Sequence, residues 1–422
     1  MAFQSIQTIL KSEDFKEAID WLDIQQKTML DLVIEWAQIN SGSHNLDGIA
    51  TMATQVLKTA TCLEADVTHI DLGDGEWVTG NGNIIPTKNG KILCLRKRPE
   101  AKYQVLLTGH LDTVFATDHP FQDITWLDDS TLNGPGVADM KGGILVMLHA
   151  LMALERSSFA KDIGWQVMLS PDEETGSLAS GQHLMEAAPN FHVGMTYEPA
   201  LADGTLAGKR KGSGNYSLIV KGVSAHAGRA FYDGRNAVVA LADMMTKLSA
   251  LSGKREGLTV NPAVISGGSA PNVVPDNAVC RFNVRLEKME DAAWFEEQVK
   301  QIIQPWQSKQ GYDVVLHGGI NRPPKEISTA NQAMMDFIAE CGKSIGLTVD
   351  YVATGGCCEG NNLAAAGLPN VDTLGVRGGM IHSDKEFLMV DSLAERAKLS
   401  ALILMAIAVG GFDEMLHSAA QK

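Results

Sequence analysis

The chain has 422 residues, which exceeds one ordinary domain and predicts two or three. Hydrophobic residues make up 45% and charged residues 20%, the proportions of a globular protein with a large core. The net charge of −15 makes nucleic acids and anionic membranes poor candidate partners, because both require basic patches, so we expect neither.

The beginning of the chain and its cysteines indicate the compartment. Residues 1–22 mix charged and apolar side chains and lack the basic-then-apolar layout of a signal peptide. The longest apolar run, residues 401–412, is shorter than the roughly 20 residues of a membrane span. The six cysteines show no framework spacing and no CxxC pair, so we expect free thiols, a cytoplasmic protein and metal ligands of other types.

Strand-like and helix-like segments alternate in the first half of the chain. Residues 104–108 form a short apolar strand before Gly109-His110, residues 140–154 have helical spacing, and residues 165–170 form a second buried strand. This order predicts an α/β fold with a mostly parallel sheet and helices on both faces. In such sheets the functional residues gather at the carboxyl ends of the strands.

A different order begins near residue 212 and ends near residue 321. It is strand, helix, strand, strand, helix, strand, at residues 215–223, 235–251, 258–266, 278–286, 291–310 and 312–317. This is the split βαβ layout of a ferredoxin-like domain. The first pattern resumes from Thr329, and residues 371–376 form another expected strand. We therefore expect a catalytic domain of residues 1–211 and 322–422, interrupted by an inserted domain of residues 212–321.

Five short motifs supply histidines and carboxylates at expected strand ends. They are Gly109-His110-Leu111-Asp112-Thr113, Gly136-Val137-Ala138-Asp139-Met140-Lys141-Gly142-Gly143, Ser170-Pro171-Asp172-Glu173-Glu174-Thr175-Gly176, Tyr197-Glu198-Pro199 and Gly379-Met380-Ile381-His382-Ser383. Imidazole and carboxylate are the groups that bind Zn²⁺ when thiolates are absent. Two zinc ions about 3.5–4 Å apart need one ligand that reaches both, which a carboxylate can do.

Two spacings within these motifs indicate roles. Asp112 lies two positions after His110 on an extended backbone, so it points to the same face and can hold the far ring nitrogen. Glu173 and Glu174 are neighbours whose side chains point apart. One of them can therefore be a ligand while the other stays free as a base.

In these motifs and their order, the chain resembles the two-zinc exopeptidases and amidohydrolases from about Gln25 to Met405. That family includes glutamate carboxypeptidase, succinyl-diaminopimelate desuccinylase, acetylornithine deacetylase and aminoacylase. The resemblance implies one zinc on His110 and Glu198, another on Glu174 and His382, and Asp139 bridging both. It also implies Glu173 as general base, Asp112 as partner of His110, and a cis peptide bond between Asp139 and Met140. Cobalt or manganese can replace zinc at such donors.

The resemblance also implies substrate contacts. His226, in Ser224-Ala225-His226-Ala227-Gly228, corresponds to a histidine that enters the active site of the partner subunit, so we expect a homodimer with the inserted domain as lid and dimerisation domain. Asn272 and Arg285 correspond to positions that bind the substrate carboxylate, for which arginine is well suited. Arg322 is a second candidate, and Gly356 belongs to the glycine-rich loop beside the substrate.

One departure from the family pattern distinguishes its branches. This chain has Gly355-Gly356-Cys357-Cys358-Glu359-Gly360-Asn361-Asn362 where relatives carry Gly-Gly-Thr-Asp or Gly-Gly-Thr-Ser-Asp-Gly. Asn361 occupies the position where desuccinylases place an arginine, which favours the glutamate carboxypeptidase branch and release of a C-terminal acidic residue from a small peptide. Two alternatives stay open: an N-acyl-amino-acid deacylase with the same zinc chemistry, and an inactive binder of amino-acid conjugates, against which Glu173 argues.

Overall fold

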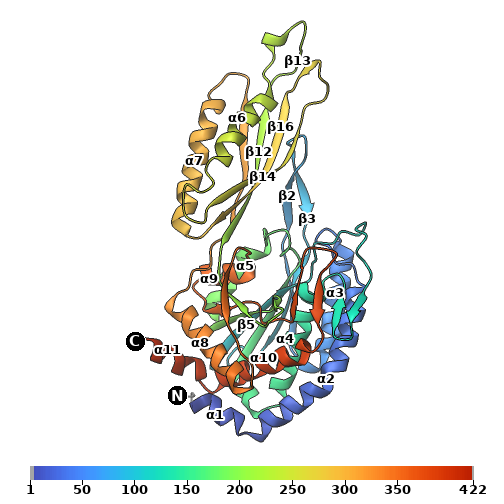
Figure 1. Cartoon of the computed structure of the whole chain (residues 1–422), viewed down its shortest axis with the longest axis vertical. Coiled ribbons are helices and arrows are strands. Elements are labelled where there is room, and N and C mark those ends of the chain that lie inside the picture. Colours follow the sequence, from blue (N-terminus) through green and yellow to red (C-terminus); the bar gives the residue numbers. More distant parts are fainter. Residues whose placement is uncertain (1–3, 421–422) are drawn as a thin grey trace.

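The computed structural model describes residues 4–420, which form two lobes along the long axis of the molecule (Figure 1). The lower lobe holds the first and last residues that the structure describes, and we call it the catalytic body. The upper lobe runs from β12 (Gly212–Lys221) to β17 (Asp313–Arg322), and we call it the small domain. The chain enters and leaves the small domain at neighbouring points, because Ser213 pairs with Arg322.

A six-stranded sheet forms the centre of the catalytic body. Its order is β1 (Asp66–Asp71), β4 (Lys91–Lys97), β8 (Ile163–Ser170), β5 (Tyr103–His110), β9 (Val193–Thr196) and β19 (Asn370–Val371). β5 runs parallel to β8 and β9, and β9 runs parallel to β19, whereas β4 is antiparallel to β1 and β8. The sheet is therefore parallel around β5, as the α/β pattern predicts.

Helices cover both faces of this sheet, because alternate residues of a strand point to opposite sides. On one face, α2 (Glu13–Ala37), α4 (Gly143–Glu155) and α10 (Ser392–Ala408) enclose Val105 and Leu107. On the other face, α5 (Ser180–Ala187) and α9 (Glu359–Ala365) enclose Leu106 and Met168. The other helices of the body are α1 (Gln4–Leu10), α3 (Leu46–Ala60), α8 (Thr329–Ser344) and α11 (Gly411–Ala420).

One helical stretch, Val137–Glu155, is long and apolar enough to cross a membrane, and so is the pair α10–α11 if its 74° bend is ignored. Val137–Glu155 is buried along its whole length inside the protein. It packs against the sheet, α2 and α10, so apolar residues surround it on all sides. Its composition is that of a central core helix.

The small domain has the predicted order of strands and helices. Its antiparallel sheet has the order β14 (Thr259–Gly267), β16 (Asn277–Leu286), β12, β17, and α6 (Ala237–Ser249) and α7 (Met289–Gln307) pack on one face. The ring of Tyr216 lies against the rings of Phe282 and Phe295 in this core. A ribbon of β13 (Ala225–His226) and β15 (Val273–Val274) projects from the far end (Figure 1).

A hairpin of the catalytic body, β2 (Asp74–Val78) and β3 (Ile84–Lys88), reaches up beside the small domain (Figure 1). Val78 packs against Ile219 and Val279, on the face of the sheet opposite α6 and α7. Arg281 donates a hydrogen bond to the Val78 carbonyl. The sequence pattern does not predict this contact between the lobes.

Two smaller sheets complete the body. One has the strand order β10 (Ala200–Leu201), β20 (Arg377–Gly379), β21 (Phe387–Met389), β7 (Thr131–Asn133) and β6 (Thr125–Asp128). The other pairs β11 (Leu206–Arg210) with β18 (Tyr351–Thr354).

The predicted strand 371–376 is too long, because only Val371 belongs to β19. The chain leaves the sheet because the buried Asp372 pairs with Arg210 and Lys325, and Thr373 has a left-handed φ of 70°.

Candidate metal centre and active-site cleft

The carboxyl ends of β5, β8 and β9 meet at a cleft of about 630 Å³, which is also lined by residues of the small domain. Each candidate ligand or base ends one of these strands, follows one, or comes from a neighbouring segment. They are His110, Asp139, Glu173, Glu174, Glu198 and His382. The structure therefore brings together motifs that are far apart in the sequence.

Asp139 lies between the two histidines. Its Oδ1 is 3.1 Å from His110 Nε2, and its Oδ2 is 3.2 Å from His382 Nε2. Glu198 Oε2 lies 3.8 Å from His110 Nε2, and Glu174 Oε2 lies 3.1 Å from His382 Nε2. Each histidine thus faces one glutamate and one oxygen of Asp139, which is the arrangement that two cations sharing a carboxylate need.

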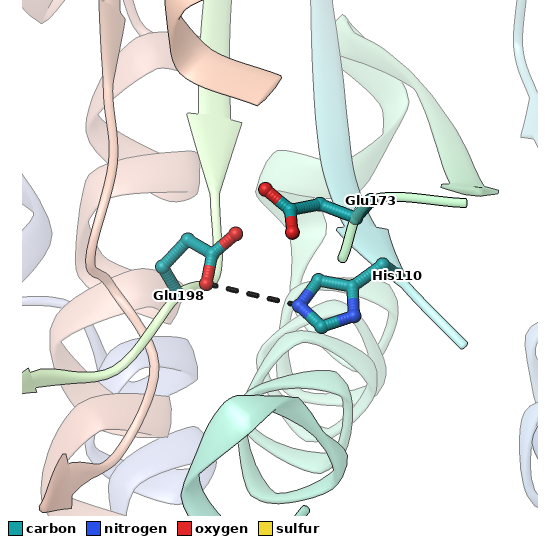
Figure 2. Close-up of side chains that lie close together, drawn as sticks. All are labelled: His110, Glu173 and Glu198. Atoms are coloured by element: carbon teal, nitrogen blue, oxygen red, sulfur yellow. Dashed lines mark ion pairs between the residues drawn. The ribbon is translucent and has the colours of Figure 1, made fainter. Parts of the chain in front are cut away.

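Glu173 and Glu198 turn towards the ring of His110 from two strand ends (Figure 2). One potential ligand atom from each of His110, Glu173 and Glu198 lies within 4.8 Å of the others, and the same holds for His110, Asp139 and Glu174. Imidazole nitrogen and carboxylate oxygen are donors that zinc, cobalt and manganese accept. The cluster can therefore hold metal ions.

The electrostatics of the cluster fit cations as well. Burial, and then the charge of Asp139, raise the pKa of Glu174 to about 8 and that of Glu198 to about 7. Oε1 of Glu198 is buried and has no hydrogen-bond partner among the described residues. Hydrogen bonds with Asp139 and Glu174 raise the pKa of His382 to about 11. Crowded buried carboxylates of this kind are stabilised as anions by a divalent cation.

Asp112 holds the site together through both its main chain and its side chain. His110 Nδ1 lies 2.9 Å from the Asp112 carbonyl oxygen and 3.5 Å from its carboxylate Oδ1. The carboxylate accepts hydrogen bonds from the N–H groups of Glu173 (3.1 Å) and Glu174 (3.2 Å) and from the Ser43 hydroxyl (2.7 Å). The side chain therefore positions the two glutamates, and the closest contact of Asp112 with His110 is through the carbonyl.

Glu386, which the sequence does not mark, holds the turn that carries Asp139. Oε1 of Glu386 accepts hydrogen bonds from the N–H groups of Ala138 and Asp139, each at 3.0 Å, and Oε2 accepts one from Gly136 at 3.2 Å. The peptide bond between Asp139 and Met140 is cis, as the resemblance implies. Glu386 is 1% exposed, and burial, followed by the charge of Asp139, raises its pKa to about 7. In the sequence it follows Asp384-Lys385, a charged run typical of a solvated surface.

The guanidinium of Arg322 contacts the predicted base. Its Nη1 lies 2.6 Å from Glu173 Oε1, and its Nη2 donates to the Glu173 carbonyl at 2.6 Å and to Ser177 Oγ at 2.9 Å. Arg322 is 4% exposed and lines the cleft. The resemblance suggests that Arg322 contacts the substrate. In the structure, the contacts of Arg322 position Glu173.

The remaining predicted substrate residues divide into two groups. Arg285 and Gly356 line the cleft, and Arg285 Nη1 donates a hydrogen bond to Cys357 Sγ at 3.0 Å. His226 and Asn272 are exposed and are not among the residues described as lining the cleft. They lie together at the β13–β15 ribbon, where the Ala227 N–H donates to the Asn272 carbonyl. One chain therefore does not bring these two residues to its own cleft.

The loop that departs from the family pattern is partly structural. The side chain of Asn361 is fully buried, and its Nδ2 donates to the carbonyls of Lys211 (3.0 Å) and Pro323 (2.7 Å). Cys358 is buried as well, and its Sγ accepts a hydrogen bond from the N–H of Gly360. Cys357 is the cysteine of this loop that contacts Arg285 in the cleft.

A third arginine lines the cleft without having been predicted. Arg210, at the end of β11, places its Nε 2.9 Å from Asp372 Oδ2, and Lys325 Nζ lies 3.1 Å from the same oxygen. All three residues are buried. In the sequence Arg210 stands within Lys209-Arg210-Lys211, a basic run that ordinarily indicates solvated surface.

Comparison with known proteins gives one family. Residues 106–406, more than half of the chain, match peptidase family M20/M25/M40. Carboxypeptidase G2 of a Pseudomonas species is 28% identical over 319 residues, covering 72% of this chain and 74% of that protein. Succinyl-diaminopimelate desuccinylase of Magnetococcus marinus is 27% identical over 216 residues, covering 46% of this chain and 56% of that protein. A metallo-carboxypeptidase of family M20 from Sulfolobus solfataricus has the same fold, with a TM-score of 0.70, 16% identity, and coverage of 90% of this chain and 99% of that one.

Proposed function

The chain belongs to peptidase family M20/M25/M40 and is a hydrolase of peptide or amide bonds, and on this premise we propose a zinc-dependent carboxypeptidase that releases a C-terminal acidic residue. The observation that carries the proposal is a single cleft that contains both a His/carboxylate cluster and the guanidinium of Arg285. Such a cleft can hold an amide at the cluster and a carboxylate at the arginine. Carboxypeptidase G2 as a relative supports this direction of cleavage.

The proposed ligand assignment follows the geometry around Asp139. His110 and Glu198 would hold one zinc, Glu174 and His382 would hold the other, and Asp139 would offer one oxygen to each. When bound, such ions supply Lewis-acid polarisation of a carbonyl group and of a water molecule. Cobalt or manganese would serve at the same donors.

Glu173 acts as general base and then as general acid. Its carboxylate takes the proton of the attacking water and delivers it to the leaving nitrogen, a role that contributes about 10²–10⁴-fold to a rate. The contact of 2.6 Å with Arg322 fixes the direction in which this carboxylate points. Arg285 binds the substrate carboxylate, which places the scissile amide at the cluster.

We propose that residues 212–321 serve as lid and dimerisation domain of a homodimer. His226 belongs to β13, which lies at the tip of the small domain (Figure 1), and it would reach a substrate only in another copy. The edge strand β14 exposes Val264 and Ile265, at 47% and 62%, which suits pairing with a second chain. The measurement is the molar mass in solution at micromolar concentration; a fully active monomer would contradict the proposal.

Mixing two inactive variants tests the exchange of His226 between chains. A dimer of one Glu173→Ala chain and one His226→Ala chain has one complete site, so random reassembly would restore about a quarter of wild-type activity. Recovery close to zero, with mixed dimers demonstrated by mass spectrometry, would place His226 outside the partner's site.

The cysteines support the cytoplasm as the expected compartment. All six are free thiols. Cys357 lines the cleft, where an oxidising environment could modify it. A reducing compartment is therefore the setting that we propose.

Metal content and a substrate panel test the reaction. We expect about two zinc ions per chain, with activity lost on chelation and restored by metal. Aryl-glutamates and dipeptides should be cleaved faster than N-acetyl or other N-acyl derivatives of neutral amino acids. The reverse preference would establish the deacylase alternative, and a metal-free protein that binds but does not cleave these compounds would establish the binder.

A further inference from the structure

Arg210 lines the cleft, and only part of its guanidinium is paired. It is only 7% exposed, and its Nε faces Asp372. No carbonyl or side chain in the described part of the chain accepts a hydrogen bond from its two terminal nitrogens, and the residue lines the cleft. These nitrogens are therefore available to a molecule that enters.

The charges around Arg210 are not balanced. Asp372 is fully buried, and its Oδ2 is shared by two cations, Arg210 at 2.9 Å and Lys325 at 3.1 Å. One carboxylate thus compensates two positive charges. Glu198 also attracts the guanidinium, but it is assigned to a zinc ion, which would take up its charge. A buried excess of positive charge is stabilised by an anion.

Arg210 and Arg285 lie on two sides of one short loop. A methyl group at Gly356 would be 3.7 Å from Arg210 Nη1, and the next residue, Cys357, accepts the hydrogen bond from Arg285 Nη1 at 3.0 Å. Arg322, the third arginine of the cleft, is occupied by Glu173. The cleft therefore offers two separate guanidinium groups to a substrate.

We propose that Arg210 binds a second carboxylate of the substrate, the side-chain carboxylate of the C-terminal residue, while Arg285 binds the α-carboxylate. This inference rests on the proposed carboxypeptidase function, and it names Arg210 as the residue that makes the enzyme selective for C-terminal acidic residues. The planar fork of an arginine held by Asp372 matches a carboxylate in two parallel hydrogen bonds. A neutral glutamine side chain would place its NH₂ group against the donors of Arg210.

The test compares two substrates that differ in one group, N-benzoyl-glutamate and N-benzoyl-glutamine, by kcat/KM of the zinc-loaded enzyme. For wild type we expect glutamate to be preferred by about 10- to 100-fold, the value of a hydrogen-bonded charge. Arg210→Met should lose this factor for glutamate and leave glutamine within about threefold. The variant leaves Asp372 paired with Lys325, one carboxylate with one cation, so the fold should persist.

Lys209→Met is the matched control. Its side chain is 38% exposed and pairs with Glu287 at 2.9 Å, and Lys209 is not among the described residues that line the cleft. It should keep the wild-type preference. Binding of free glutamate and free glutamine to the zinc-loaded proteins, measured by calorimetry, gives a second comparison that does not depend on turnover.

The outcomes separate the two proposals. A glutamate preference that persists in Arg210→Met, or an equal loss of rate and binding for both compounds at unchanged zinc content and melting temperature, would overturn the role of Arg210 alone. A wild-type enzyme that cleaves and binds both compounds equally would overturn the acidic specificity itself. A selective loss for glutamate, absent from Lys209→Met, would support both.

Discussion

Replacing Glu386 by glutamine tests how Asp139 is held between the two histidines. Oε1 of Glu386 accepts two backbone hydrogen bonds and Oε2 accepts a third, from Gly136. The oxygen of a glutamine can keep the first two bonds, but its NH₂ group would face the Gly136 N–H, a donor against a donor. The two remaining bonds would also lose the assistance of a negative charge.

The expected loss of unfolding free energy follows from these three contacts. A buried donor left unsatisfied costs about 1–3 kcal/mol, and a charged hydrogen bond exceeds a neutral one by about 1 kcal/mol. The total is roughly 3–5 kcal/mol at most, because glutamine also removes the burial cost that raises the pKa of Glu386. Because the pKa of Glu386 is raised to about 7, the measurement belongs at pH 8, where the carboxylate is ionised.

The assay is urea denaturation of the zinc-loaded protein, with zinc affinity measured by competition with a chelator. We expect affinity to fall by about 10- to 100-fold, as for other groups that orient metal ligands. Asp384→Asn is the control, since it removes the same charge from an exposed side chain two residues away and should change stability by less than about 0.5 kcal/mol. A Glu386→Gln protein with the midpoint and zinc affinity of wild type would refute the argument.

Three further predictions concern the metal cluster. Glu173→Ala should keep its zinc and lose turnover by about 100-fold or more; activity above about a tenth of wild type would contradict its role as base. The metal-free protein should melt at progressively lower temperature from about pH 5 to 8, because Glu174 and Glu198, with pKa values of about 8 and 7, keep protons in the folded state that the unfolded chain releases. Scanning calorimetry of chelated protein measures this, and a melting temperature that rises over that range would contradict it. The zinc at His382 should exchange before the zinc at His110, because their side chains are 53% and 0% exposed; chelation that removes both ions in one phase would exclude this order.

The candidate metal cluster could be predicted to come together because its geometry follows from simple rules. His110 ends β5, Glu173 and Glu198 follow β8 and β9, and the ends of parallel strands converge. The sequence marks these residues by position alone. The residues that position them cannot be recognised in this way. Glu386 accepts a hydrogen bond from the N–H of Asp139, 247 residues earlier in the chain. Nothing in the local sequence indicates which distant loop a charged residue will contact.

The same limit applies to strands and surfaces. Residues 371–376 have the composition of a strand, but Asp372 leaves the sheet to pair with cations from two other segments. The small domain was predictable element by element because its periodicities are local. Its contact with the β2–β3 hairpin was not predictable. Ile219 and Val279 are apolar, as residues are in any strand with two covered faces, and this does not indicate which segment covers them.

That hairpin makes the small domain less modular than its continuous stretch of sequence suggests. A separate protein cut from residues 212–321 would bare Ile219 and Val279 to water and leave Arg281 without its acceptor on Val78. The body, in turn, would carry a hairpin with no surface to lie on, and two-stranded hairpins are barely stable alone. The two lobes therefore complete each other's structure, and we expect them to unfold in one cooperative transition, so that transplanting the small domain into another protein would require the hairpin to travel with it.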